Sequence, residues 1–131
     1  MKKAEPIPGG KAPHPHDIME RSFLFAVRIV QLCGFLDERP GVGRIMMSQI
    51  LRAGTSVPSN VKEAQAADSK PDFIHKMSIA LKEARETQLR LRLLATANIV
   101  PENKIKPPIQ EADEVRRIIG AIVVSAKRGD A

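Results

Sequence analysis

The feature that most constrains the fold of this chain is an apolar pattern of helical spacing that recurs in four segments. Apolar residues follow one another at steps of three and four, which places them along one side of a helix. Proline, glycine or polar residues separate the segments, whose approximate ranges are 17–37, 42–68, 70–98 and 108–128. Because no strand-and-turn pattern appears elsewhere, the sequence predicts an all-α protein built as a helical bundle.

The third segment has the clearest start and the most regular pattern. Ser69 is in position to cap its first turn, where Pro71 costs no hydrogen bond because the first N–H groups of a helix have no partner. The spacing predicts that seven residues form the seam of an antiparallel bundle: Ile74, Met77, Leu81, Ala84, Gln88, Leu91 and Ala95. The fourth segment repeats the pattern with Ala112, Val115, Ile119, Ile122 and Ala126.

The first segment carries more apolar surface than one bundle core requires. It opens at Asp17, which fits a capping box with Glu20, and its apolar residues cover an arc of roughly 220° on a helical wheel. In the third segment, Ile79, Leu89 and Leu93 lie off the predicted seam. Both features indicate a second apolar interface, and so a homo-oligomer that uses these three residues. The alternative is scattered surface residues, which are common.

The second segment combines an apolar stripe with a line of polar side chains around Pro58. This predicted polar seam consists of Arg52, Ser56, Asn60 and Glu63 of the second segment, with Glu83 and Glu86 of the third segment as acidic partners. An arginine–glutamate network would satisfy backbone groups near Pro58 and fix the register of the helices. The alternative is general acid–base catalysis, which needs a cleft and shifted pKa values.

The chain is basic, with 21 Lys and Arg against 15 Asp and Glu and a net charge of +6. This balance favours polyanionic partners, RNA or DNA among them. Residues 70–100 hold a local surplus of three positive charges. The candidate nucleic-acid-binding residues are Lys76, Lys82, Arg85, Arg90 and Arg92. The alternative is a solvated, ion-paired face, because Glu86 has i, i+4 neighbours in Lys82 and Arg90.

Signatures of enzymes, cofactors and metals are not found in the sequence. The run Gly41-Val42-Gly43 lacks the third glycine and the preceding strand of a nucleotide-binding loop. Cys33 lies on the apolar arc, which predicts a core residue and not a nucleophile. His14 and His16 lack a fixed third ligand for a metal ion. We therefore expect no enzymatic activity, no cofactor and no metal.

The remaining composition bears on location and domain limits. No apolar run approaches the roughly 18 residues of a membrane span, and a single cysteine forms no internal disulfide, which favours the cytoplasm. Residues 1–16 contain four prolines and two glycines, so we expect a flexible tail. The bundle is expected to span residues 17–128, with 129–131 as a short C-terminal end.

Several short motifs in residues 51–94 occur together. Ser56-Val57 is followed by Asn60 and then by Glu63-Ala64, and Phe73 near a helix start precedes the stretch from Lys82 to Thr87. In this order they resemble the core signature of the four-helix-bundle family named for intervening sequences of bacterial 23S ribosomal RNA genes. The resemblance spans about residues 17–100. It departs from the family where Gln88-Leu89 replace the usual aromatic residue.

This resemblance implies an up-down-up-down four-helix bundle that assembles into a ring-like homopentamer. Family relatives include the accessory protein of diversity-generating retroelements, a basic bundle that works with a reverse transcriptase and nucleic acid. Our first hypothesis is therefore a non-enzymatic oligomeric bundle that binds RNA or DNA. The second is a protein–protein scaffold or accessory subunit for a partner enzyme, without nucleic-acid affinity of its own. The third is an enzyme that uses Arg52 and Glu63.

Overall fold

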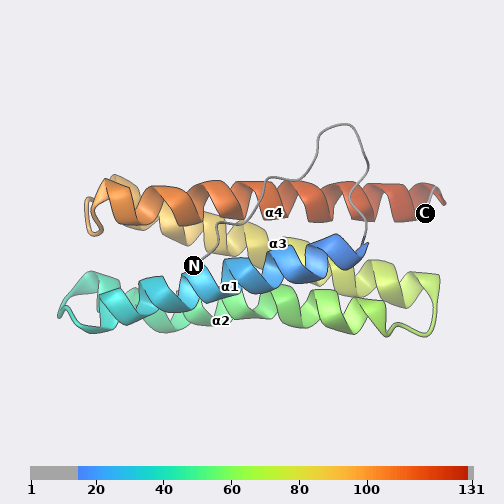
Figure 1. Ribbon diagram of the computed structural model, residues 1–131, viewed down its shortest axis with the longest axis horizontal. Coiled ribbons are helices and arrows are strands. Elements are labelled where there is room, and N and C mark those ends of the chain that lie inside the picture. The colour runs from blue at the N-terminus through green and yellow to red at the C-terminus, as the bar shows by residue number, and fades with distance from the viewer. Residues whose placement is uncertain (1–14, 130–131) are drawn as a thin grey trace.

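A computed structural model describes residues 15–129 and contains four α-helices. They are α1 (Pro15–Asp37), α2 (Val42–Gln65), α3 (Lys70–Thr96) and α4 (Glu102–Arg128). Short connections make successive helices antiparallel, so the bundle runs up, down, up and down (Figure 1). Each helix packs against its neighbours in sequence, and α1 also packs against α4, which closes the bundle. The all-α prediction is confirmed for the described residues.

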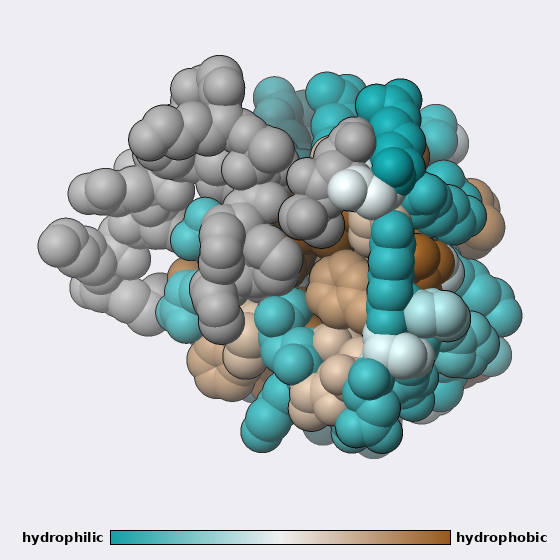
Figure 2. All heavy atoms as spheres, turned by 90° about the vertical axis from the view of Figure 1, so that its right-hand side faces the viewer, coloured by the Kyte–Doolittle hydropathy of each residue, from teal (hydrophilic) through white to brown (hydrophobic). Residues whose placement is uncertain are grey.

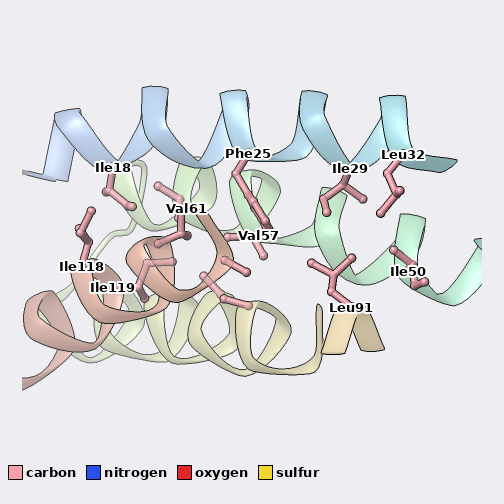
Figure 3. Packing of buried hydrophobic residues seen from close by; sticks show 14 of the residues in the cluster. Ile18, Phe25, Ile29, Leu32, Ile50, Val57, Val61, Leu91, Ile118 and Ile119 are labelled. Carbon is pink, nitrogen blue, oxygen red and sulfur yellow. The ribbon is translucent and has the colours of Figure 1, made fainter. Parts of the chain in front are cut away.

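The core is formed by aliphatic side chains and one phenylalanine from all four helices (Figure 3). Phe25 and Ile29 of α1 point into the interior of the bundle, where Val57 of α2, Leu91 of α3 and Ile119 of α4 also lie, and all five are fully buried. Burial of such a side chain contributes about 1.5–3 kcal/mol to folding. The apolar stripes of the second and fourth segments are therefore core, as their spacing predicted.

The first residues of α3 and α1 show how well local sequence patterns predict where a helix begins. The Ser69 hydroxyl accepts a hydrogen bond from the backbone N–H of Asp72 at 3.2 Å, so the predicted cap of α3 is confirmed. α1 begins at Pro15, two residues before the predicted start at Asp17. Proline suits the first turn of a helix because its fixed φ is already helical.

The predicted start of the fourth helix at residue 108 is wrong. α4 begins at Glu102 and continues through Pro107 and Pro108. These prolines donate no hydrogen bond to the carbonyls of the preceding turn, which normally ends a helix. Here Ile105 and Pro108 are buried in the bundle, and this packing offsets the missing hydrogen bonds.

The buried side of α3 is turned relative to the predicted seam. Met77, Ala84 and Leu91 are buried as predicted, but the other four seam residues are only partly buried. The structure instead buries Ala80 and Leu94, together with Thr87, whose hydroxyl donates to the Glu83 carbonyl at 2.7 Å. α3 packs against both α2 and α4, so its buried side is wider than a single seam.

Seen from the end at which α2 joins α3, hydrophilic side chains lie above, below and to the right of an apolar centre (Figure 2). No helix in residues 15–129 is long and apolar enough to cross a bilayer. The predicted tail of residues 1–16 falls largely outside the described residues, and its last two residues belong to α1. At the C-terminus of α4, Gly129 caps the helix with a positive φ of 80°.

Candidate functional site

Arg52 of α2 connects its helix to α3 through two carboxylates. Its Nη1 donates to Glu83 at 2.9 Å and its Nη2 donates to Glu86 at 3.0 Å. Arg90 donates to the same Glu86 carboxylate at 2.9 Å, so one glutamate holds two arginines. These contacts fix the register between the antiparallel helices α2 and α3. We call Arg52, Glu83, Glu86 and Arg90 the arginine–glutamate network.

The electrostatics of this network follow from its hydrogen bonds. The pKa of Glu86 is lowered from 4.5 to about 2, chiefly because Arg90 donates a hydrogen bond to its ionised form. The pKa of Arg52 is raised, first by its hydrogen bond to Glu86 and next by the charge of Glu83. Both shifts favour the charged forms of Glu86 and Arg52 at neutral pH, and the two carboxylates of α3 each accept a hydrogen bond from an arginine.

The other residues of the predicted polar seam do not join the network. The Ser56 hydroxyl donates to the Arg52 carbonyl at 2.6 Å, and the Asn60 amide donates to the Ser56 carbonyl at 2.8 Å. Both side chains thus bond to their own helix near Pro58. Glu63 is exposed and forms no ion pair within residues 15–129. It lies three turns, about 16 Å, along α2 from Arg52.

The five candidate nucleic-acid-binding cations lie on different sides of α3. Lys76 and Arg90 share the side of Glu83, which contacts α2, because these three residues are seven apart. Arg85 and Arg92, also seven apart, share another side, and Arg85 lines a hollow between α3 and α4. Lys82 is exposed on the outward side. Arg90 is held by Glu86, whereas the other four form no ion pair in the described part of the chain.

Sequence reasoning missed three cations of α4 that line the same hollow as Arg85, namely Arg116, Arg117 and Lys127. Arg116 donates to Asp113 at 2.7 Å and to Gln88 at 3.0 Å, and Arg117 contacts Asp113 at 3.0 Å. The hydrogen bond from Arg116 lowers the pKa of Asp113 most. The available signal was the pair of adjacent arginines, Arg116 and Arg117, within the apolar pattern of the fourth segment.

The candidate oligomer residues lie on the outer surface of α3. Ile79 is partly buried, whereas Leu89 is 57% and Leu93 50% exposed. Ile45 of α2 is 77% exposed and was not anticipated. It lies two turns before Arg52, as Leu93 lies two turns after Glu86. Because α2 and α3 are antiparallel and joined at Arg52 and Glu86, Ile45 and Leu93 lie on the same outer face.

Two further residues of the wide arc of α1 are exposed. Phe23 and Val30 are about half accessible, whereas Cys33 lies on the buried side of α1 near the Met47 carbonyl. Burial raises the pKa of the Cys33 thiol to about 11, so this thiol is protonated at neutral pH. Cys33 is thus a core residue, as the sequence predicted. Among the described residues, no group of three acidic, His or Cys side chains could hold a metal ion.

Comparison with protein families identifies the chain. Residues 15–121 match the family model described as 23S rRNA-intervening sequence protein. The chain belongs to this family. The match includes α1 to α3 and most of α4, so Arg85, Arg116 and Arg117 lie inside it and Lys127 lies beyond it.

One solved structure shows the same fold in a relative. It is the crystal structure of a protein with unknown function from the S23 ribosomal protein family of Bacteroides thetaiotaomicron. The two chains are 37% identical, the match covers 83% of this chain and 96% of the other, and the TM-score is 0.76. A comparison with curated proteins gives no match. Membership of the 23S rRNA-intervening sequence family confirms the resemblance found in the sequence motifs. It does not define an activity, which we infer below from the charged and apolar residues on the surface.

Proposed function

We propose that this chain is a non-enzymatic, oligomeric helical bundle that binds RNA or DNA through the basic outer surface of α3. One observation carries the proposal. Lys82, Arg85 and Arg92 are exposed and form no ion pair within residues 15–129, whereas Glu83 and Glu86 are occupied by Arg52 and Arg90. The outer positive charge of α3 is therefore not compensated by its own carboxylates.

The mechanism is electrostatic. Each exposed cation that contacts a phosphate releases a counterion, so affinity depends steeply on salt and little on base sequence. The chain contains no Trp or Tyr and only four Phe, which disfavours recognition by base stacking. Self-association would repeat a modest basic surface several times and strengthen binding through multivalency.

The test is fluorescence anisotropy with short labelled RNA, single-stranded DNA and duplex DNA of mixed sequence, titrated between about 50 and 200 mM salt. We expect wild-type affinity to fall at least tenfold across this range. The triple variant Lys82→Glu, Arg85→Glu, Arg92→Glu should lose measurable binding while keeping its oligomeric mass. Salt-independent binding, or an unaffected triple variant, would contradict the proposal.

A control variant reverses two other exposed cations that have no ion pair in the described residues, Lys62 of α2 and Lys106 of α4. The variant Lys62→Glu, Lys106→Glu should bind within about threefold of wild type, because only long-range, salt-screened repulsion changes. A loss equal to that of the triple variant would mean that net charge alone decides binding.

The exposed apolar residues favour a second candidate function, a scaffold for a partner protein. Ile45 and Leu93 give the outer face of α2 and α3 an apolar area, as protein–protein interfaces require. Under this alternative, purified wild-type protein binds none of the three nucleic acids, and Leu93→Asp weakens retention of a partner protein without changing the helical circular dichroism.

A further inference from the structure

We propose that the hollow between α3 and α4 is the place where the basic surface holds the sugar–phosphate backbone of a nucleic acid. The hollow has a volume of about 600 Å³. Arg85 of α3 and Arg116, Arg117 and Lys127 of α4 line it, so both helices contribute positive charge to one depression. The inference rests on the proposed function and assigns its phosphate contacts to particular side chains.

The cations of α4 are spaced as an extended binding surface requires. Arg117, Gly120, Val124 and Lys127 follow one another at steps of three and four, so they lie along one side of α4. From Arg117 to Lys127 the helix advances about 15 Å. One strand of a B-form duplex presents about four phosphates over this length. The hollow can therefore face several phosphates of one strand.

A single carboxylate orients two of the arginines without cancelling the charge of the hollow. Asp113 accepts from Arg116 at 2.7 Å and contacts Arg117 at 3.0 Å. Gln88 of α3 accepts a further hydrogen bond from Arg116 at 3.0 Å. Arg85 and Lys127 form no ion pair within the described residues. The lining thus contains four cations and no acidic residue, and two of the cations, Arg116 and Arg117, are held in position by Asp113.

Gly120 keeps the middle of the hollow open at a cost to helix stability. A Cβ atom at this position would have Leu81 as its nearest neighbour at 3.9 Å, which is ordinary contact distance. Packing therefore does not require glycine here, and glycine inside a helix is about 0.5–1 kcal/mol less favourable than alanine. The missing side chain leaves the depression between the cations accessible.

The walls of the hollow indicate which part of a nucleic acid enters it. Besides the cations, the lining consists of the polar Ser78, Gly120 and the aliphatic Leu81, Val123 and Val124, and it includes no aromatic ring for stacking a base. Arginine and lysine recognise phosphate oxygens of any sequence. We therefore expect binding of the backbone without base preference.

The test compares loss of charge with loss of space, using anisotropy with a labelled single-stranded RNA of mixed sequence. The variant Arg85→Gln, Arg117→Gln removes two cations, and Gly120→Leu fills the hollow without changing charge. Both should weaken binding about tenfold or more, and the first should lower the salt slope by about 0.7 unit per lost contact, the value for a single strand. Gly34→Leu is the control for the leucine substitution, because nothing lies within 4 Å of a Cβ at Gly34.

The outcomes separate the hollow from the general proposal. The inference is supported if Arg85→Gln, Arg117→Gln and Gly120→Leu both weaken RNA binding, if Gly34→Leu binds like wild type, and if all these variants unfold at the wild-type temperature. The hollow is overturned as the binding site, and the proposed function kept, if two results occur together. Gly120→Leu leaves binding unchanged, and the double variant Lys82→Gln, Arg92→Gln weakens binding as much as the double variant Arg85→Gln, Arg117→Gln. A wild-type protein that binds no RNA or DNA at low salt overturns the proposed function itself.

Discussion

Glu86 accepts hydrogen bonds from two arginines, Arg90 on its own helix and Arg52 on α2. Its pKa is lowered from 4.5 to about 2, chiefly by the hydrogen bond from Arg90. A carboxyl whose pKa is lower in the folded than in the unfolded chain stabilises the fold while it is ionised. The contribution of Glu86 is therefore fully present above pH 4.5 and is lost as the pH falls toward 2.

We expect Glu86→Gln to reduce the free energy of unfolding at pH 7 by less than about 1 kcal/mol, because water reaches the ion pairs. The difference between wild type and variant should shrink as the pH falls through this window. Urea unfolding followed by circular dichroism at pH values from 2 to 7 measures it. A difference that stays constant over the whole range would show that the charge of Glu86 does not stabilise the bundle.

At the scale of helices, α1 and α2 approach closely at Gly54, where α2 has no side chain. A Cβ atom at Gly54 would lie 2.8 Å from the Cγ2 atom of Ile29, which is shorter than a real contact allows. Ile29 is fully buried, and a buried side chain in a close-packed core has little room to move. Gly54 therefore sets the distance between the two helices, although glycine itself weakens a helix.

We expect Gly54→Ala to destabilise the protein by about 1–2 kcal/mol, because the overpacking cost exceeds the gain in helix propensity. The control is Gly34→Ala on the outward side of α1, where a Cβ atom has open space. It should stabilise the bundle by about 0.5–1 kcal/mol. Thermal unfolding of both variants measures these opposite changes in stability. Equal stabilisation by both would contradict the close approach of α1 and α2 at Gly54.

The order of the helices and most of the core could be predicted from the sequence, because both depend on local spacing. The early start of α4 could not, because local rules penalise Pro107 and Pro108 and only tertiary packing offsets that penalty. Arg52 and Glu83 were grouped in one predicted polar seam, and the hydrogen bond between them became visible only in the structure. Arg117 was missed because it meets Arg85, 32 residues away, only through the register of α3 against α4.

At the scale of the whole molecule, the bundle has apolar residues on its outside as well as in its core. Ile45 and Leu93 lie on the face of α2 and α3, and Phe23 and Val30 lie on α1, all at least half exposed. Exposed apolar residues that share a face, as Ile45 and Leu93 do, are typical of interaction surfaces. We therefore propose that copies of the chain associate through them, and the family resemblance suggests five copies.

We expect light scattering after size-exclusion chromatography to give five times the 14.4 kDa chain mass. Ile45→Asp, Leu93→Asp should reduce this mass, since two charges would be buried at the contact. Lys62→Glu should leave it unchanged. Because the chain lacks Trp and Tyr, refractive index must report protein, and absorbance at 260 nm then reports bound nucleic acid. A monomeric wild type would contradict self-association.

The even number of antiparallel helices has a mechanical consequence. The start of α1 and the end of α4 lie at the same end of the bundle (Figure 1). These two helices contact each other directly, and the ion pairs Arg21–Glu114 and Arg28–Glu111 connect them. A force applied between these two ends would separate α1 from α4 one contact after another, as a zipper opens, and would not load all contacts together. The bundle should therefore yield to stretching far more easily than its packed core suggests.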